Sequence, residues 1–178
     1  NAYLEYLPEP TIPCRHTRFI ADTAIRIAPS ATLFYSEVYM SGRKYFDGGE
    51  TFQYDILSVC SHAERPDGEQ LFREKFIIRP GACPPGTLGA MNGYDVFANV
   101  IVMTPPEHAD RIYEATPAFI DRDRRLAAGI TRLPNDAGLL YKVLGEETGP
   151  VKKLIREFCS SVRLEVKGRP LPEEFPWR

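Results

Sequence analysis

The stretch that decides the fold is ATLFYSEVYMSGRKYFDGGETFQY, residues 31–54. Apolar and aromatic side chains alternate over 31–40, and successive strand residues face opposite sides of a sheet, so the pattern predicts a strand there. A short Gly-rich turn follows, and a second alternating run predicts another strand over 51–60. Arg43 and Glu50 stand at the two ends of this turn.

The rest of the chain holds further short runs of the same kind. Residues 1–13 contain three prolines and predict an extended edge or connector, because proline fixes φ and lacks an N–H donor. Amphipathic patterns predict two helices, one from about Pro106 and one over about 150–164. Many short strands followed by helices indicate an all-β sandwich, barrel or solenoid with appended helices, although no repeat of fixed period is visible. The other predicted strands are 17–27, 69–79, 94–103, 127–133 and 138–144, the last two forming a hairpin.

Length and composition describe an ordinary globular chain. The 178 residues are 43% hydrophobic and 26% charged, which suits a single domain over 1–178 or part of a slightly larger one. The net charge is −2 and the two signs are interspersed, so no basic field predicts nucleic-acid binding. No apolar run approaches the ~18 residues of a membrane helix and no signal peptide is recognised, so we expect no membrane association. Because the chain starts at Asn1 and not at Met, we expect an N-terminal part to be missing.

The four cysteines predict free thiols. Cys14, Cys60, Cys83 and Cys159 are widely separated, and none forms a CxxC pair of the kind found in zinc ribbons or thioredoxin-like sites. A disulfide framework would be denser in cysteine, so a reducing cytoplasm is the expected location.

Two Cys-x-His pairs are candidate metal ligands. Residues i and i+2 of a strand share a face, so Cys14 with His16, and Cys60 with His62, could each offer a thiolate and an imidazole. Together the pairs would make a Cys2His2 set, provided that the intervening chain folds back to join them. The alternative is that Cys60 ends a core strand and His62 begins a polar loop, and structural zinc motifs normally use closer pairs.

Other patterns point less directly to chemistry. The Gly-rich turn lacks a following Gly-Lys-Ser/Thr and a helix, so it does not predict a phosphate-binding loop. His108, in the first turn of the predicted helix, is expected at the surface. Cys83 in a Gly/Pro-rich loop could act as a thiol nucleophile, but no local motif supplies its base. Arg43 and Glu50 are expected to brace the turn as a salt bridge or to contact a partner protein, since Tyr and Arg are enriched at interfaces.

Several segments in order resemble the urease accessory protein UreD (UreH) family. Together they cover nearly the whole chain: LEYLPEPTIP at 4–13, LFYSEVYMSGRKYFDGGETFQY at 33–54, FREKFIIRP at 72–80, MNGYDVFANVIVM at 91–103 and LLYKVLGEETGPVKKLIREFCSSVR at 139–163. Two positions depart from the family's usual residues, Lys142 in place of Arg and Phe158 in place of Trp. The family's proteins also begin earlier, which agrees with the missing start expected from Asn1.

The resemblance implies a mainly β fold, distorted two-layer or β-helix-like, with two late α-helices. It implies a protein without catalytic activity that binds apo-urease and, on another surface, a helical urease accessory protein that recruits a nickel-binding GTPase. No cofactor would be tightly bound, and nickel would be in transit, along an internal water-filled route in this family. Glu37, Arg43, Glu50 and Asp55 are the candidates for a partner interface or the metal route, because their strand or turn positions place charge close to the core.

Two other hypotheses remain open at this point. A stand-alone metal-binding protein would use Cys14, His16, Cys60 and His62 and would lose its metal when any one ligand is changed. A cysteine hydrolase would use Cys83 and would be inactivated by alkylation.

Overall fold

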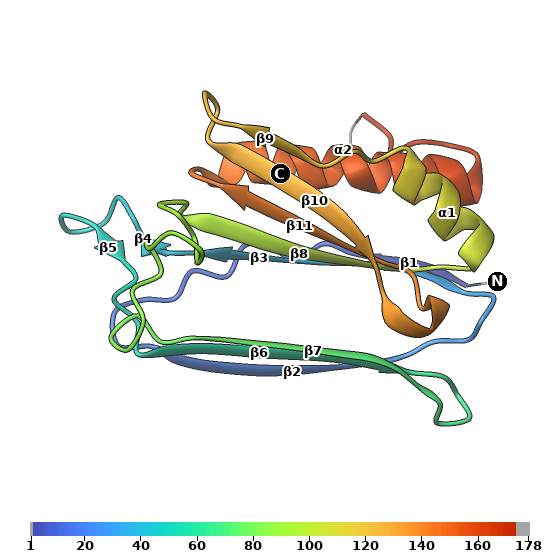
Figure 1. Cartoon of the computed structure of the whole chain (residues 1–178), viewed down its shortest axis with the longest axis horizontal. Coiled ribbons are helices and arrows are strands. Elements are labelled where there is room, and N and C mark those ends of the chain that lie inside the picture. The colour runs from blue at the N-terminus through green and yellow to red at the C-terminus, as the bar shows by residue number, and fades with distance from the viewer. Residues whose placement is uncertain (1, 174–178) are drawn as a thin grey trace.

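Two β-sheets lie face to face in the computed structural model, which describes residues 2–173 (Figure 1). The larger sheet has six strands in the order β1 (Tyr3–Tyr6), β3 (Thr32–Met40), β8 (Val96–Met103), β11 (Leu139–Gly145), β10 (Leu126–Arg132) and β9 (Phe119–Asp121). The smaller sheet has three strands in the order β2 (Arg18–Arg26), β6 (Ile56–Glu64) and β7 (Gln70–Ile78). A separate two-stranded ribbon joins β4 (Gly42–Arg43) to β5 (Glu50–Thr51).

Most neighbouring strands are antiparallel, and the two parallel pairs lie at sheet edges. β1 runs parallel to β3 with Tyr6 opposite Tyr35, and β2 runs parallel to β6 with Asp22 opposite Cys60. In the centre of the larger sheet β8 pairs antiparallel with both β3 and β11. A parallel pair needs a long crossover connection. Here each crossover includes a strand of the other sheet and not a helix: β2 lies between β1 and β3 in sequence, and β3 lies between β2 and β6.

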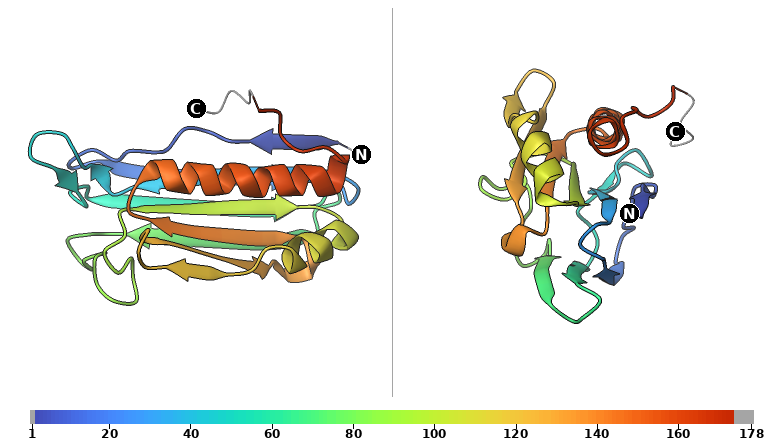
Figure 2. Two further views of the ribbon diagram at one scale, coloured as in Figure 1. Left: turned by 90° about the horizontal axis from the view of Figure 1, so that it is seen from above. Right: turned by 90° about the vertical axis from the view of Figure 1, so that its right-hand side faces the viewer.

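Two helices cover the outer face of the larger sheet. α1 (Pro106–Glu114) begins with proline, whose fixed φ suits the first helical turn, and α2 (Thr148–Lys167) lies lengthwise over the sheet (Figure 2). The apolar stripe of α2 recurs at spacings of three and four and packs on Phe34, Val100 and Tyr141 of the strands. Its buried members are Val151, Ile155, Phe158, Cys159 and Val162.

The space between the two sheets is filled mainly by aromatic and branched side chains. At one end Tyr35 and Ile101 of the larger sheet pack with Phe72 of the smaller one. At the other end Tyr39 contacts the ring of Phe76 edge-on at 5.5 Å. Since α2 covers the opposite face, β3 is buried on both sides, which explains its nearly continuous apolar sequence.

The expected fold class is confirmed. The chain is mainly β with two helices, the second late in the sequence, and the sheets form two layers without closing into a barrel within residues 2–173. The predicted helices and the hairpin of β10 and β11 are present. Neither helix in this range has the length and apolar character needed to cross a bilayer.

One predicted strand is wrong in its extent. The alternation over 51–60 predicts a continuous strand, but only Glu50 and Thr51 pair with β4, and β6 starts at Ile56. Phe52 adopts φ +54, a left-handed conformation that redirects the chain between the ribbon and the smaller sheet. Its N–H donates to the Ser41 carbonyl at 2.6 Å, so this break in the strand is held by a backbone hydrogen bond.

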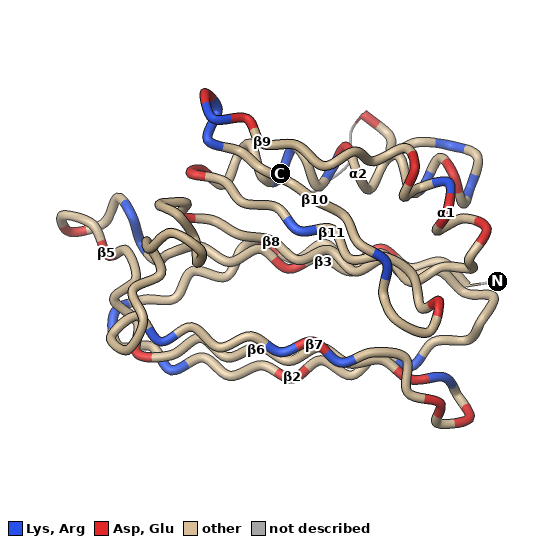
Figure 3. Tube along the Cα trace, in the orientation of Figure 1, with Lys and Arg blue, Asp and Glu red and all other residues tan. Residues whose placement is uncertain are grey.

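Charged positions are dispersed over the described chain. Figure 3 shows acidic and basic positions interspersed on the loops, the helices and the smaller sheet, with only isolated charges on the strands of the larger sheet. The distribution agrees with the sequence, in which neither sign forms a continuous run.

Candidate functional site

An ion pair between Arg43 and Glu50 closes the β4–β5 ribbon. This is the first of the two alternatives that the sequence offered for these residues, a salt bridge that braces the turn. Arg43 and Glu50 are directly opposite in the ladder, and the guanidinium donates two hydrogen bonds to the carboxylate at 2.7 and 2.8 Å. The Glu50 side chain is only 4% exposed. The hydrogen-bonded Arg43 guanidinium lowers the pKa of Glu50, so the carboxylate stays ionised. This two-point geometry fixes the start and the end of the turn relative to each other.

The close approach of β4 to β5 depends on a glycine. Gly42 has φ +139, and a Cβ atom there would lie 1.9 Å from the backbone oxygen of Glu50. A side chain at this position would therefore push the two strands of the ribbon apart. Arg15 adds a second cation, with its Nε 3.8 Å from Glu50 Oε1, and also donates to Gln53 Oε1 at 2.8 Å.

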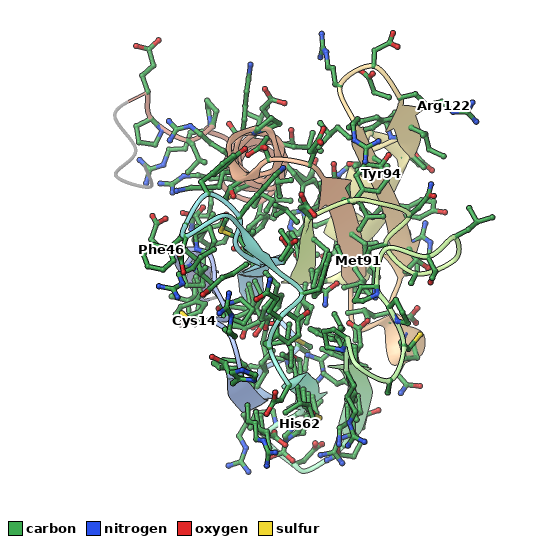
Figure 4. All side chains as sticks on the ribbon, turned by 90° about the vertical axis from the view of Figure 1, so that its left-hand side faces the viewer. Cys14, Phe46, His62, Met91, Tyr94 and Arg122 are labelled. Atoms are coloured by element: carbon green, nitrogen blue, oxygen red, sulfur yellow. The ribbon has the colours of Figure 1, made fainter. Side chains whose placement is uncertain are left out.

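The tip of the turn presents aromatic side chains to solvent. Tyr45 is 79% exposed and Phe46 is 51% exposed, and Phe46 lies at the outer side of the molecule in the end-on view of Figure 4. The Arg43 guanidinium carbon lies 3.8 Å from the centre of the Phe46 ring, a cation–π contact. An aromatic tip with a stacked arginine is the composition typical of protein interface centres.

A second set of contacts ties this turn to the start of α2. Lys44 Nζ lies 2.9 Å from Asp95 Oδ2 and 2.8 Å from Glu147 Oε1. The Tyr45 hydroxyl also donates to Glu147 at 2.5 Å. Lys44, followed by Tyr45, lowers the pKa of Glu147 through these hydrogen bonds. The ion pair of Arg43 with Glu50 therefore holds the base of the turn, and the contacts of Lys44 and Tyr45 with Glu147 hold its side. These contacts restrict the conformations of the turn that carries the aromatic tip.

Asp55 lies beside the same end of the molecule but in a different network. Its carboxylate accepts from Arg18 Nε at 3.2 Å and lies 3.4 Å from His16 Nδ1. Arg18, and then His16, lower the pKa of Asp55. Gln53 links the two networks, because it contacts Arg15 through its side chain and accepts the His16 N–H through its backbone.

Glu37 is in the interior, between the two sheets. It shares its face of β3 with Tyr35, whose hydroxyl donates to Glu37 Oε1 at 2.5 Å. Burial raises the pKa of Glu37, and the Tyr35 hydrogen bond only partly offsets that effect. Glu37 is therefore separated from the Arg43–Glu50 pair, and the four candidates do not form one cluster.

Sequence reasoning missed a polar row that continues from Glu37. Cross-strand pairing places Glu37 opposite Asn99, and Asn99 opposite Lys142 on the next strand. Lys142 Nζ contacts Glu74 Oε1 of the smaller sheet at 2.5 Å. The exposed fraction of Lys142 is 53%, so the row runs from the interior to solvent. The only sequence signal was a charged or amide residue at an inward-facing position of each strand, and strand order was needed to align them.

Two hollows flank this interior. A cavity of about 220 Å³ between the sheets is lined by Phe76, Met91, Phe97, Asn99 and Lys142, among others. A larger groove of about 560 Å³ runs between the edges of β1 and β2, with Leu4, Tyr6 and Ile25 in its lining. The smaller cavity contains the exit of the polar row, and its volume is several times the roughly 30 Å³ that one water molecule occupies in the liquid.

The two predicted Cys-x-His pairs are not brought together. His16 precedes β2, whereas His62 lies opposite Ala24 near the far end of the β2–β6 pair. From Arg18 to Ala24 alone the strand advances by roughly 20 Å, and Figure 4 shows Cys14 and His62 in separate parts of the molecule. The Cys2His2 arrangement is therefore not formed. Cys60 and His62 do share a face of β6, and there they approach Asp22 instead.

The remaining candidates are accounted for individually. Cys83 is exposed in its loop, and the three histidines lie beside acidic residues elsewhere, so none of them is placed as a base for Cys83. His108 is not a plain surface residue as expected. Its Nδ1 lies 2.8 Å from Glu165 Oε1, and this contact joins α1 to α2.

Comparison with known proteins finds one family along the whole chain. The model of the UreD urease accessory protein family matches residues 1–178. The chain belongs to the UreD urease accessory protein family. A relative named urease accessory protein UreD 2 from Brucella suis biovar 1 is 51% identical over 177 residues, which is 99% of this chain and 59% of the relative. Urease accessory protein UreD from Yersinia enterocolitica is 47% identical over 184 residues, covering 100% of this chain and 57% of the relative.

The family assignment confirms the resemblance inferred from the ordered segments. This chain spans less than two thirds of the length of these UreD relatives. The structure shows how the quoted segments combine: 33–54 supplies β3 and the β4–β5 ribbon, and 139–163 supplies β11 and most of α2.

Proposed function

We propose that this chain is a non-catalytic scaffold for urease maturation. In this role it assists the insertion of nickel into apo-urease, together with a helical accessory protein and a nickel-binding GTPase recruited through it, in the cytoplasm. The observation that carries the proposal is the match of the UreD family model to the entire chain, with relatives near 50% identity named as urease accessory proteins.

The β4–β5 turn is the surface we assign to a partner. Its exposed tip combines Tyr45 and Phe46 with Arg43, and these residue types contribute strongly at interface centres. The ion pair at its base and the Glu147 contacts at its side hold the backbone before a partner arrives. Binding to such a turn loses little conformational entropy, which favours affinity.

The polar row between the sheets supports the route for nickel. Glu37, Asn99 and Glu74 offer oxygen atoms, whereas Ni²⁺ is held more firmly by imidazole and other nitrogen ligands. These oxygen atoms are therefore suited to passage of the ion and not to its storage, and the ammonium of Lys142, at the exposed end of the row, is paired with Glu74. Burial raises the pKa of Glu37, so its negative charge is costly in the interior between the sheets and would be compensated by a passing cation.

The experiment that tests the scaffold role is a pull-down from cells producing urease subunits and the other accessory proteins. We compare the chain with a Tyr45→Ala/Phe46→Ala variant and with Leu88→Ala, a control at another exposed apolar side chain, which is 88% exposed. We expect the double variant to reduce recovery of urease or the helical partner at least tenfold, because exposed anchors of this kind typically contribute 2 kcal/mol or more. The Leu88 variant should retain recovery.

A second pair of variants separates the interface from the route. Glu37→Gln should leave recovery intact and slow nickel-dependent activation of urease in the reconstituted complex, because the interior carboxylate is remote from the turn. If neither urease nor an accessory protein is recovered with the unmodified chain, the scaffold role is wrong. If the Tyr45/Phe46 variant is recovered as well as the Leu88 variant, the scaffold remains and the turn is not its interface.

A further inference from the structure

The outer face of the smaller sheet carries three potential metal ligands. Strand pairing places Asp22 of β2 directly opposite Cys60 of β6, and His62 follows Cys60 on the same face. The carboxylate oxygen, the thiol sulfur and the imidazole nitrogen all lie within 4.8 Å of one another. No sequence motif predicts this set of ligands. Asp22 comes from a different strand than Cys60 and His62, and only the parallel register of β2 and β6 brings it close to them.

The distances are close to those of a tetrahedral site. Zinc–ligand bonds of about 2.0–2.2 Å to nitrogen and oxygen put two tetrahedral ligands about 3.4 Å apart. Asp22 Oδ1 and His62 Nδ1 are 3.2 Å apart. The Cys60 sulfur lies within 4.8 Å of both atoms. A zinc–sulfur bond of about 2.3 Å would put it about 3.6 Å from them, so a side-chain adjustment of at most about 1 Å completes three corners.

The histidine nitrogen that faces this set makes no well-aligned hydrogen bond. His62 Nδ1 is shielded from solvent, and although Asp22 Oδ1 lies 3.2 Å away, it has no hydrogen bond of good geometry to any of the described residues. Buried polar atoms are normally satisfied, so an ion placed among this nitrogen, the carboxylate and the thiol would give the nitrogen a better-aligned partner. A metal ion would accept its lone pair directly.

Arg73 of β7 lies beside two of these three groups. Its Nε lies 3.4 Å from Cys60 Sγ, and its Nη2 lies 4.0 Å from Asp22 Oδ2. The guanidinium thus supplies a positive charge beside the two acidic groups. The Arg73 side chain is 66% exposed, so it can swing into solvent without disturbing the core.

We propose that Asp22, Cys60 and His62 bind one divalent transition-metal ion of the Zn²⁺ class, with the fourth position open to solvent. Thiolate and imidazole ligands select this class over Mg²⁺ and Ca²⁺, which prefer oxygen ligands alone. On binding, the Cys60 thiol releases its proton to solvent and Arg73 moves out. The carboxylate and the thiolate then neutralise the charge of the ion. The site lies on the opposite side of the smaller sheet from the polar row, so it does not rest on the proposed nickel route.

The test is direct binding of Zn²⁺ and Co²⁺ to the untagged chain. The background carries Cys14→Ser and Cys83→Ser, which removes the two exposed thiols. We expect one ion per chain by equilibrium dialysis, and a sulfur-to-cobalt charge-transfer band with Co²⁺. Asp22→Asn, Cys60→Ser and His62→Gln should each weaken binding at least 10-fold, since even outer-shell changes cost 10–100-fold at metal sites. Cys60→Ser should also abolish the charge-transfer band.

Two further variants make the outcome decisive. His16→Gln, in the other Cys-x-His segment, should leave binding unchanged. Arg73→Gln should tighten it, because the competing cation is gone. Circular dichroism confirms that each variant is folded. The proposal is overturned if the background chain binds no stoichiometric ion, if the cobalt complex lacks a thiolate band, or if folded Asp22→Asn and His62→Gln variants bind as tightly as the background.

Discussion

Replacing Gly42 with alanine tests whether the β4–β5 ribbon depends on backbone contact. The new Cβ would lie 1.9 Å from the Glu50 oxygen, so the strands must separate by about 1.5 Å to reach an ordinary contact of 3.4 Å. An unusual backbone conformation of this kind costs about 1–3 kcal/mol in a residue other than glycine. Losing two ribbon hydrogen bonds adds about 0.5–1.5 kcal/mol each. We therefore expect the free energy needed to open the ribbon to fall by about 2–6 kcal/mol.

The measurement combines urea unfolding with amide hydrogen exchange of Phe52, whose N–H bonds to Ser41 next to the ribbon. Opening confined to the ribbon appears as faster exchange of this amide, and wider destabilisation also lowers the urea midpoint. Gly48→Ala is the matched control, because Gly48 has φ +78 but nothing within 4 Å of its Cβ position. It should cost only about 1–2 kcal/mol of left-handed strain. Equal exchange rates and equal midpoints in the two variants would refute the steric argument.

Two other predictions concern the two layers of the core. Ile155→Ala on α2 removes a side chain with no exposed surface and should lower the free energy of unfolding by about 2–5 kcal/mol. Leu164→Ala, at a 52% exposed position of the same helix, should lower it far less. Urea unfolding measures both changes. Burial raises the pKa of Glu37, so the folded chain retains this proton to higher pH than the unfolded chain. Stability from this group should fall as pH rises above the ordinary glutamate pKa of about 4.3, and Glu37→Gln should flatten that decline; a steeper decline in the variant would contradict the assignment.

The elements of this fold were largely predictable because each depends on a local pattern. Alternation predicted β3 and β8, and the three- and four-residue spacing of Val151, Ile155 and Phe158 predicted α2. The prediction of a continuous strand over 51–60 was wrong at Phe52, which has a positive φ. Nothing in the type of this residue, which is not glycine, predicts that conformation. Local patterns do not encode such a kink, since the Ser41 hydrogen bond that holds it is a tertiary contact.

The candidate sites were less predictable because they depend on strand order. The sequence offered a salt bridge between Arg43 and Glu50 as one of two alternatives, because the two residues stand at the ends of one turn, and the structure contains this salt bridge. Asp22 lies 38 residues before Cys60 along the chain, and only a parallel pairing of β2 with β6 makes them neighbours. Sequence reasoning instead considered joining Cys60 to Cys14, which matched residue types without knowledge of the topology.

The polar row between the sheets has an energetic consequence that bears on function. Glu37 and Asn99 occupy positions where apolar residues would complete the layer formed by Tyr35, Tyr39 and Ile101, and Lys142 continues the row to solvent. Replacing buried ionic groups by apolar ones is often neutral or stabilising, so fold stability does not explain a charged row at this depth. Its hydrogen bond to Tyr35 and its ion pair to Glu74 limit the desolvation cost without removing it. A row that is partly compensated, and that reaches solvent through a cavity, is what passage of a cation would require, and this is the physical reason for our proposal that a nickel route lies between the sheets.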